Sequence, residues 1–151
     1  TLLMVHPTTA ALAIFCAIWF AVEGLNASES NRGRIRLSAL LSALLMAATW
    51  VTGSYWYVVY YAADKAIILN GAWPFAHKFF MEAKEHAFFI TLVLSLYLAI
   101  VARKEDFVRN RSARTLALCV ALLVILSAFA IEGAGSMIAM GVRIGLMQGG
   151  N

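Results

Sequence analysis

The sequence predicts an all-α integral membrane protein, a bundle of four transmembrane helices. Hydrophobic residues make up 62% of the 151 positions and charged residues only 13%, whereas soluble domains average roughly a quarter charged residues. The mean hydropathy is +0.80. Four apolar stretches are each long enough to cross a bilayer, which takes about 20 residues. No connection is long enough for a soluble domain, so we expect residues 1–151 to form a single transmembrane domain.

The four spans are expected at residues 7–26, 38–62, 79–102 and 115–141. The first starts at Pro7, whose missing N–H suits a first helical turn. The second ends in tyrosines and tryptophans, including Trp56 and Tyr60, which are typical of the lipid–water boundary. The connection at residues 64–78 contains Asn-Gly and Pro turn signals but is rich in apolar residues. We expect it to lie on the membrane surface or to cover the outer end of the bundle.

The basic residues predict the orientation. Eight of them fall in or beside the first and third connections, against two in the middle one: Arg32, Arg34, Arg36, Arg103, Lys104, Arg109, Arg111 and Arg114 against Lys65 and Lys78. Short basic loops stay cytoplasmic, so we expect both termini outside, in a bacterial cytoplasmic membrane. Anionic lipid accounts for the net charge of +4, and nucleic acid is excluded as a partner.

Ionisable residues gather towards the outer side of the predicted bundle. His6 precedes the first span, and Glu132 lies about 27 Å along the fourth at 1.5 Å per residue. The third span begins with a polar stripe that occupies an arc of about 80–100°, made of Lys78, Glu82, Glu85, His86 and Phe89. His77 lies on the opposite side of a straight helix. Because a polar group in hydrocarbon is costly, such residues usually have a partner, a ligand or a task.

Haem b is the first interpretation of this cluster, since imidazoles from two helices commonly hold the iron between them. We expect His86 and His6 as axial ligands, with His77 as the alternative to His6. Other predicted cofactor contacts are the aromatic residues Trp56 and Tyr60 and the acidic residues Glu82, Glu85 and Glu132. Glu82, Glu85 or Lys78 would pair with the propionates or orient an imidazole. The protein resembles small membrane cytochromes in helix number only.

Two other cofactor interpretations stay open. Carboxylate and imidazole ligands from Glu82, Glu85, His86, Glu132 and His6 suit non-haem iron or manganese, although the Glu-x-x-His pairs of di-iron bundles are missing. Copper would add the methionines Met4, Met81 and Met137. A quinone beside His86 or Tyr60, or a proton pathway through the buried carboxylates, is the other interpretation.

The function expected from the sequence is therefore a small electron-transfer subunit. It would bind haem b in the outer half of the bundle and exchange electrons with a quinone or an outer-face carrier. The alternative is a non-catalytic accessory subunit of a larger respiratory or photosynthetic complex, in which the same charges form ion pairs and helix caps. Either way, we expect other membrane subunits or further copies of this chain as partners. No phosphate-binding loop, nucleophile elbow or HExxH motif supports a hydrolase or nucleotide-driven pump.

Overall fold

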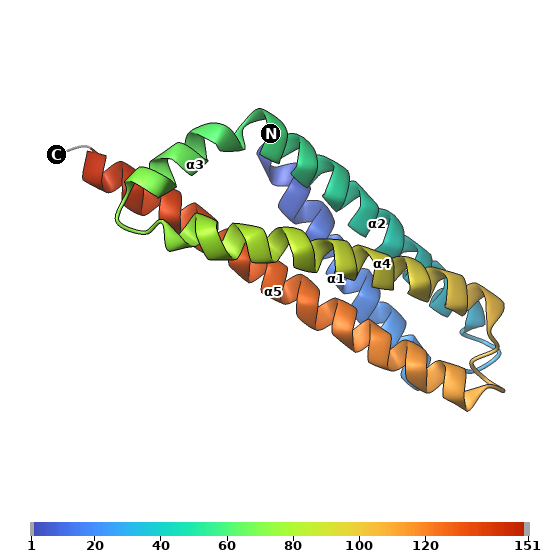
Figure 1. Cartoon of the computed structure of the whole chain (residues 1–151). Coiled ribbons are helices and arrows are strands. Elements are labelled where there is room, and N and C mark those ends of the chain that lie inside the picture. The colour runs from blue at the N-terminus through green and yellow to red at the C-terminus, as the bar shows by residue number, and fades with distance from the viewer. Residues whose placement is uncertain (1, 150–151) are drawn as a thin grey trace.

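The computed structural model describes residues 2–149 and is almost entirely helical (Figure 1). Four helices in this part of the chain are long and apolar enough to cross a membrane, which confirms the predicted all-α class and the predicted number of such helices. They are α1 (Leu2–Leu25), α2 (Arg32–Val59), α4 (Glu82–Lys104), which continues the π-helix η1 (Ala76–Met81), and α5 (Arg111–Gly149). A shorter helix, α3 (Tyr61–Asn70), lies between α2 and η1.

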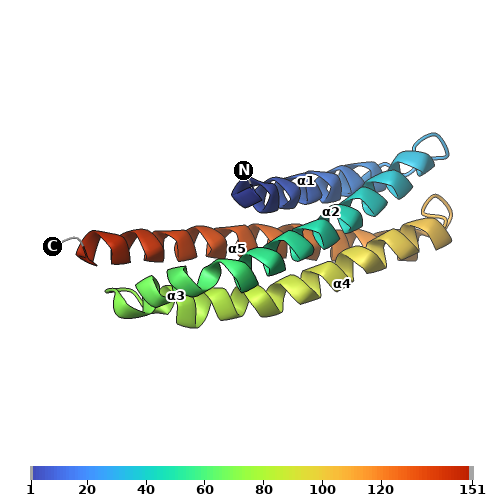
Figure 2. The same cartoon turned by 90° about the horizontal axis from the view of Figure 1, so that it is seen from above.

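The four long helices run alternately up and down and form an elongated bundle (Figures 1 and 2). Helix α1 packs against α2 and α5, and α4 packs against the same two helices. Within residues 2–149, α1 and α4 do not pack against each other, and neither do α2 and α5. These are therefore the two diagonal pairs. We call the end with the α1–α2 and α4–α5 connections the loop end, and the opposite end, which carries α3, the pocket end.

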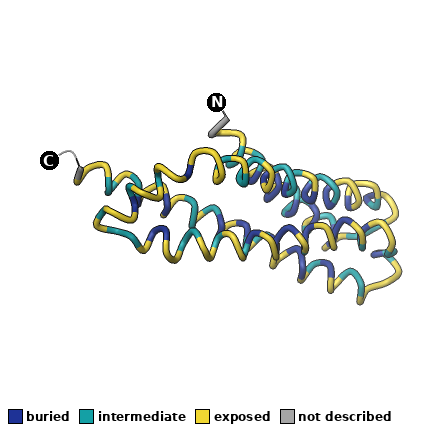
Figure 3. Tube along the Cα trace, turned by 45° about the horizontal axis from the view of Figure 1, so that its top comes forward, coloured by how far each residue is buried: buried dark blue, intermediate teal, exposed yellow. Residues whose placement is uncertain are grey.

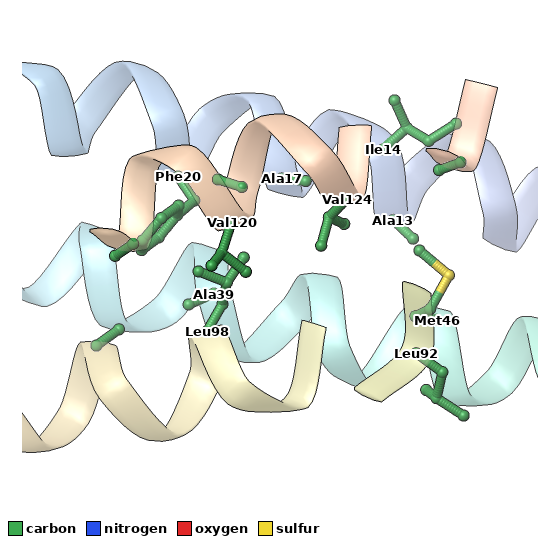
Figure 4. Close-up of a cluster of buried hydrophobic side chains, with 14 of the residues drawn as sticks. Ala13, Ile14, Ala17, Phe20, Ala39, Met46, Leu92, Leu98, Val120 and Val124 are labelled. Carbon is green, nitrogen blue, oxygen red and sulfur yellow. The ribbon is translucent and has the colours of Figure 1, made fainter. Parts of the chain in front are cut away.

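The core combines small side chains with a few large ones (Figure 4). Ala13, Ala17 and Ala39 are buried where helices approach closely, and Phe20 fills the space towards the loop end. Small residues allow such approach where lipid removes the hydrophobic drive for helix association. Many of the exposed residues on the outer faces of the helices, yellow in Figure 3, are large and apolar. A helix surrounded by lipid needs such an apolar outer surface.

A polar network closes the loop end. The buried Asn31 donates from Nδ2 to Glu23 Oε2 at 2.8 Å and to the carbonyl oxygen of Asn26 at 3.1 Å. Arg32 joins the two connections by an ion pair of 2.8 Å with Asp106. Partial burial opposes ionisation of Asp106, but backbone N–H groups of Val108 and Arg109 and the Arg32 guanidinium lower the pKa of this carboxyl below its usual value.

The lowered pKa of Asp106 predicts the pH dependence of stability. A carboxyl with a lowered pKa stabilises the fold above its ordinary value of 3.8, and this stabilisation disappears as the pH falls through the lowered value. Asp106→Asn should therefore lower the midpoint of thermal unfolding at neutral pH, and the gap to wild type should close in acid. Thermal scans of detergent-purified protein between about pH 7 and about pH 2 measure this gap. A gap that stays constant with pH would contradict the assignment.

Helix α5 is much longer than a membrane crossing needs. Its 39 residues span about 58 Å at 1.5 Å per residue, against about 30 Å of hydrocarbon. Its C-terminal part packs against α3 and η1, and the three segments form what we call the far lobe. The N–H of Ala72 donates to Gln148 Oε1 at 2.8 Å. The connection predicted at residues 64–78 thus packs against the C-terminal part of α5, where α3 meets this helix in Figure 1.

Candidate ligand-binding site

A cavity of about 450 Å³ lies at the pocket end, between α1, α2 and the start of α4. It exists because the diagonal helices α1 and α4 do not meet, while α2 closes one side. Its walls are largely aromatic, with Trp50, Trp56, Tyr57, Tyr61 and Phe88 among the lining residues. The volume falls within the range of roughly 300–1,000 Å³ typical of small-molecule and cofactor sites.

His6 enters this cavity from α1. The helix begins at Leu2 rather than at Pro7, so His6 lies within the helix, about 28 Å from its other end at Leu25. Its ring atom Nδ1 is 3.0 Å from the carbonyl oxygen of Thr49 on α2. A carbonyl oxygen only accepts, so Nδ1 carries the proton and Nε2 of the neutral ring keeps its lone pair. Nε2 makes no hydrogen bond within the described chain. Among the described residues, only Arg32 Nε is a fully buried side-chain nitrogen or oxygen without a hydrogen-bond partner, so Nε2 of His6 is accessible.

Gly53 fixes the place of the His6 ring. A Cβ atom at Gly53 would lie 2.6 Å from Cε1 and 2.9 Å from Nδ1 of His6, closer than real Cβ contacts come. Any other residue here would push the imidazole away from the carbonyl of Thr49. Helix α2 therefore holds His6 twice: the Thr49 carbonyl oxygen accepts a hydrogen bond from Nδ1, and the missing side chain of Gly53, one helical turn further on, leaves room for the ring.

Helix α4 forms the wall across from His6. Met81, Lys84, Glu85 and Phe88 line the cavity, and their spacing of three, four and seven residues places them on one helix face. Lys84 is half-buried and Phe88 is buried, whereas Glu85 is exposed at the rim. This face begins at Met81, the last residue of the π-helix η1, and such wide turns are frequent at functional sites. The cavity thus holds an imidazole, an ammonium and a carboxylate beside aromatic rings.

His77 and Tyr61 form a buried pair behind the cavity wall. The Tyr61 hydroxyl is 2.9 Å from His77 Nδ1, and both side chains are buried. Tyr57 stacks on Tyr61 with ring centroids 5.2 Å apart. Tyr61 and Tyr57 line the cavity, whereas His77 does not. The pair therefore joins α3 to η1 and supports the aromatic wall.

The structure brings together some of the residues predicted from sequence and separates others. His6, Trp56 and Glu85 line the cavity. His86 and Glu82 are exposed on another face of α4, where His86 Nδ1 lies 2.7 Å from the carbonyl oxygen of Glu82. The remaining predicted residues are Tyr60, which stacks on Trp56 at 4.7 Å, and Glu132, which lines a separate cavity of about 10 Å³ beside Phe88.

Several residues that line this cavity had not been singled out as ligand contacts from sequence, among them Thr49, Gly53, Lys84 and Phe88. Thr49 acts through its backbone, which carries no sequence signal. Gly53 does carry one, since glycine inside a helix costs roughly 0.5–1 kcal/mol and so indicates a close approach. Within residues 2–149, no three His, Cys, Asp or Glu side chains come together as ligands for a metal ion. Haem ligation by one or two imidazoles needs no such cluster.

Comparisons of the chain with protein-family models, with curated proteins and with solved structures find no match.

Proposed function

We propose that this chain binds haem b in the cavity at the pocket end and works as a membrane electron-transfer subunit. The observation that carries the proposal is the state of His6. Metal-bound histidines almost always donate their second ring N–H to a carbonyl or carboxylate, which fixes the tautomer and orients the ring. His6 has this arrangement through Thr49, and its Nε2 is accessible with a lone pair available for iron.

The other walls suit a flat macrocycle. Trp50, Trp56 and Phe88 offer apolar surface around His6, and a cofactor site is usually an apolar cleft with a few placed polar groups. Bound haem would supply one-electron chemistry, while the protein sets its potential through the axial ligand, burial and nearby charge. In this chain the nearby charges are those of Lys84 and Glu85. The pair predicted from sequence, His86 with His6 or with His77 as the alternative to His6, stays a prediction.

The basic loops give the site a side of the membrane. They lie at the end opposite the cavity, and because short basic loops stay cytoplasmic, haem b in this cavity would lie towards the outer face. His6 would stand at about the depth where the hydrocarbon ends. Electrons would therefore pass between the cavity and a quinone in the outer leaflet or a carrier at the outer surface.

An absorption spectrum tests the proposal directly. The chain is expressed with ample haem, purified in detergent, and measured as a reduced-minus-oxidised difference with pyridine haemochrome quantification. We expect sharp α and β bands of b-type haem at roughly one haem per chain. A colourless protein under these conditions would overturn the proposal and favour the accessory-subunit alternative, for which co-purification of a partner complex is the next measurement.

A further inference from the structure

Lys84 is a half-buried cation inside the cavity that makes no ion pair or side-chain hydrogen bond within the described chain. The ion pairs there involve Arg32, Arg34 and Arg109. The Nζ atom of Lys84 has no hydrogen-bond partner in the described chain but is not fully buried, so it remains accessible. A lysine that is partly withdrawn from water and unpaired costs free energy, and buried charges are normally paired.

The groups around Lys84 do not remove this cost. Glu132 on α5 is close enough to act on Lys84 electrostatically, but the two form no ion pair within 4.0 Å. His6 lines the same cavity as Lys84, with its Nδ1 engaged by the carbonyl oxygen of Thr49. Glu85 follows Lys84 on the same helix and lies at the rim. Gly135 gives the ammonium its room, since a Cβ there would lie 3.2 Å from Nζ.

We propose that Lys84 binds a carboxylate of the ligand that occupies the cavity. The inference rests on the proposed function, because haem b carries two propionate groups and no other strong anion. His6 then meets the iron and Lys84 a propionate, so two groups on diagonal helices orient one molecule. The ammonium is a compact point charge with three donors, which suits a carboxylate.

This assignment differs from the one expected from sequence, which named Lys78 among the propionate partners. Lys78 lies in η1, is exposed, and does not line the cavity. Lys84 lies nearly two turns further along, on the face shared by Met81 and Phe88. Lys78 therefore serves as a matched control, with the same charge and a nearby position outside the cavity.

The experiment compares haem with its dimethyl ester, in which both carboxylates are blocked. Each is titrated into haem-free wild type, Lys84→Gln, Lys84→Arg and Lys78→Gln in detergent, and affinity is read from the absorption change. Wild type should bind haem about tenfold to a hundredfold more tightly than the ester, as a charged hydrogen bond predicts. Lys84→Gln should lose this preference, Lys84→Arg should keep most of it, and Lys78→Gln should behave as wild type.

The outcomes separate the two proposals. Equal binding of haem and ester by wild type, or a full preference in Lys84→Gln, would overturn the role of Lys84 while haem binding stands. Binding of neither molecule by wild type would overturn the proposed function itself. Glu132→Gln controls for a purely structural interaction between Lys84 and Glu132. If Lys84 only stabilised Glu132, Lys84→Gln and Glu132→Gln would both lower stability, and neither would change the ratio of the affinities for haem and for its ester.

Discussion

His6→Ala is expected to abolish haem binding in the purified protein while the four helices still form. The substitution removes the only imidazole that lines the described cavity and leaves the aromatic walls in place. Because His6 is half-buried near one end of α1 and outside the main apolar core, helix content by circular dichroism should stay close to that of wild type. The readout is haem per chain by pyridine haemochrome after purification under identical conditions.

Gly53→Ala tests the same site without touching the ligand. The added Cβ would meet the His6 ring at 2.6 Å, so the imidazole must turn away from the carbonyl of Thr49. Loss of such an orienting contact typically weakens metal binding by about 10- to 100-fold. Gly33→Ala is the matched control on the same helix, because a Cβ at Gly33 meets nothing within 4 Å.

His86→Ala decides between the structure and the ligand pair predicted from sequence. If haem is lost in His6→Ala and kept in His86→Ala, His6 is the necessary ligand and the second axial position is filled by another group. If both variants lose haem, the predicted pair of His6 and His86 is right, and α4 must turn on its axis when haem binds. Retention of haem in His6→Ala would contradict the proposed site.

Gly145→Ala is expected to separate α3 from the C-terminal part of α5 within the far lobe. A Cβ at Gly145 would lie 2.7 Å from Ile67 Cγ2 and 2.8 Å from the Ile67 carbonyl oxygen. The second contact is with backbone, which cannot turn aside, so α3 must move away from α5. Overpacking of this kind costs about 1–3 kcal/mol. The lobe should become susceptible to limited proteolysis at the turn near Gly71, and the unfolding temperature in detergent should fall.

Gly133→Ala is the control for this variant. It makes the same change on the same helix, but a Cβ at Gly133 meets nothing within 4 Å. Removing a glycine from a helix interior is favourable by roughly 0.5–1 kcal/mol, so the control should equal or slightly exceed wild type in stability. Equal behaviour of the two variants would show that α3 does not pack on α5 as described.

The helices could be predicted because hydropathy is a local property of the chain. The positions of His6 and Glu85 at the starts of the first and third spans predicted that both lie at the same end of the bundle, and both line the same cavity. The direction in which the polar stripe of the third span points could not be predicted from residue positions along the chain. Two members of the predicted stripe, His86 and Glu82, are exposed on the outside of the bundle. Lys84, which lies between them in the sequence, lines the cavity instead.

The missing information is which helices pack together. Four antiparallel helices can be arranged in more than one order, and the order decides which face of α4 looks towards α1. That choice depends on packing between residues far apart in sequence, such as Ser42 Oγ with the carbonyl oxygen of Ala13 at 3.2 Å and Thr91 with Ser127 at 2.8 Å. A π-helical turn before α4 shifts the angular position of the side chains around the helix, which no hydropathy pattern reports.

If the proposed haem fills the gap between α1 and α4, folding and haem supply become a single equilibrium. A ligand in the space between these two helices would replace the contact that they do not make with each other. Such a ligand would bind only the folded chain. Its concentration then enters the free energy of unfolding as a logarithm, so that a hundredfold excess over the dissociation constant contributes about 2.7 kcal/mol. On that proposal, a shortage of haem would lower the stability of the protein itself, since empty chains would unfold more often.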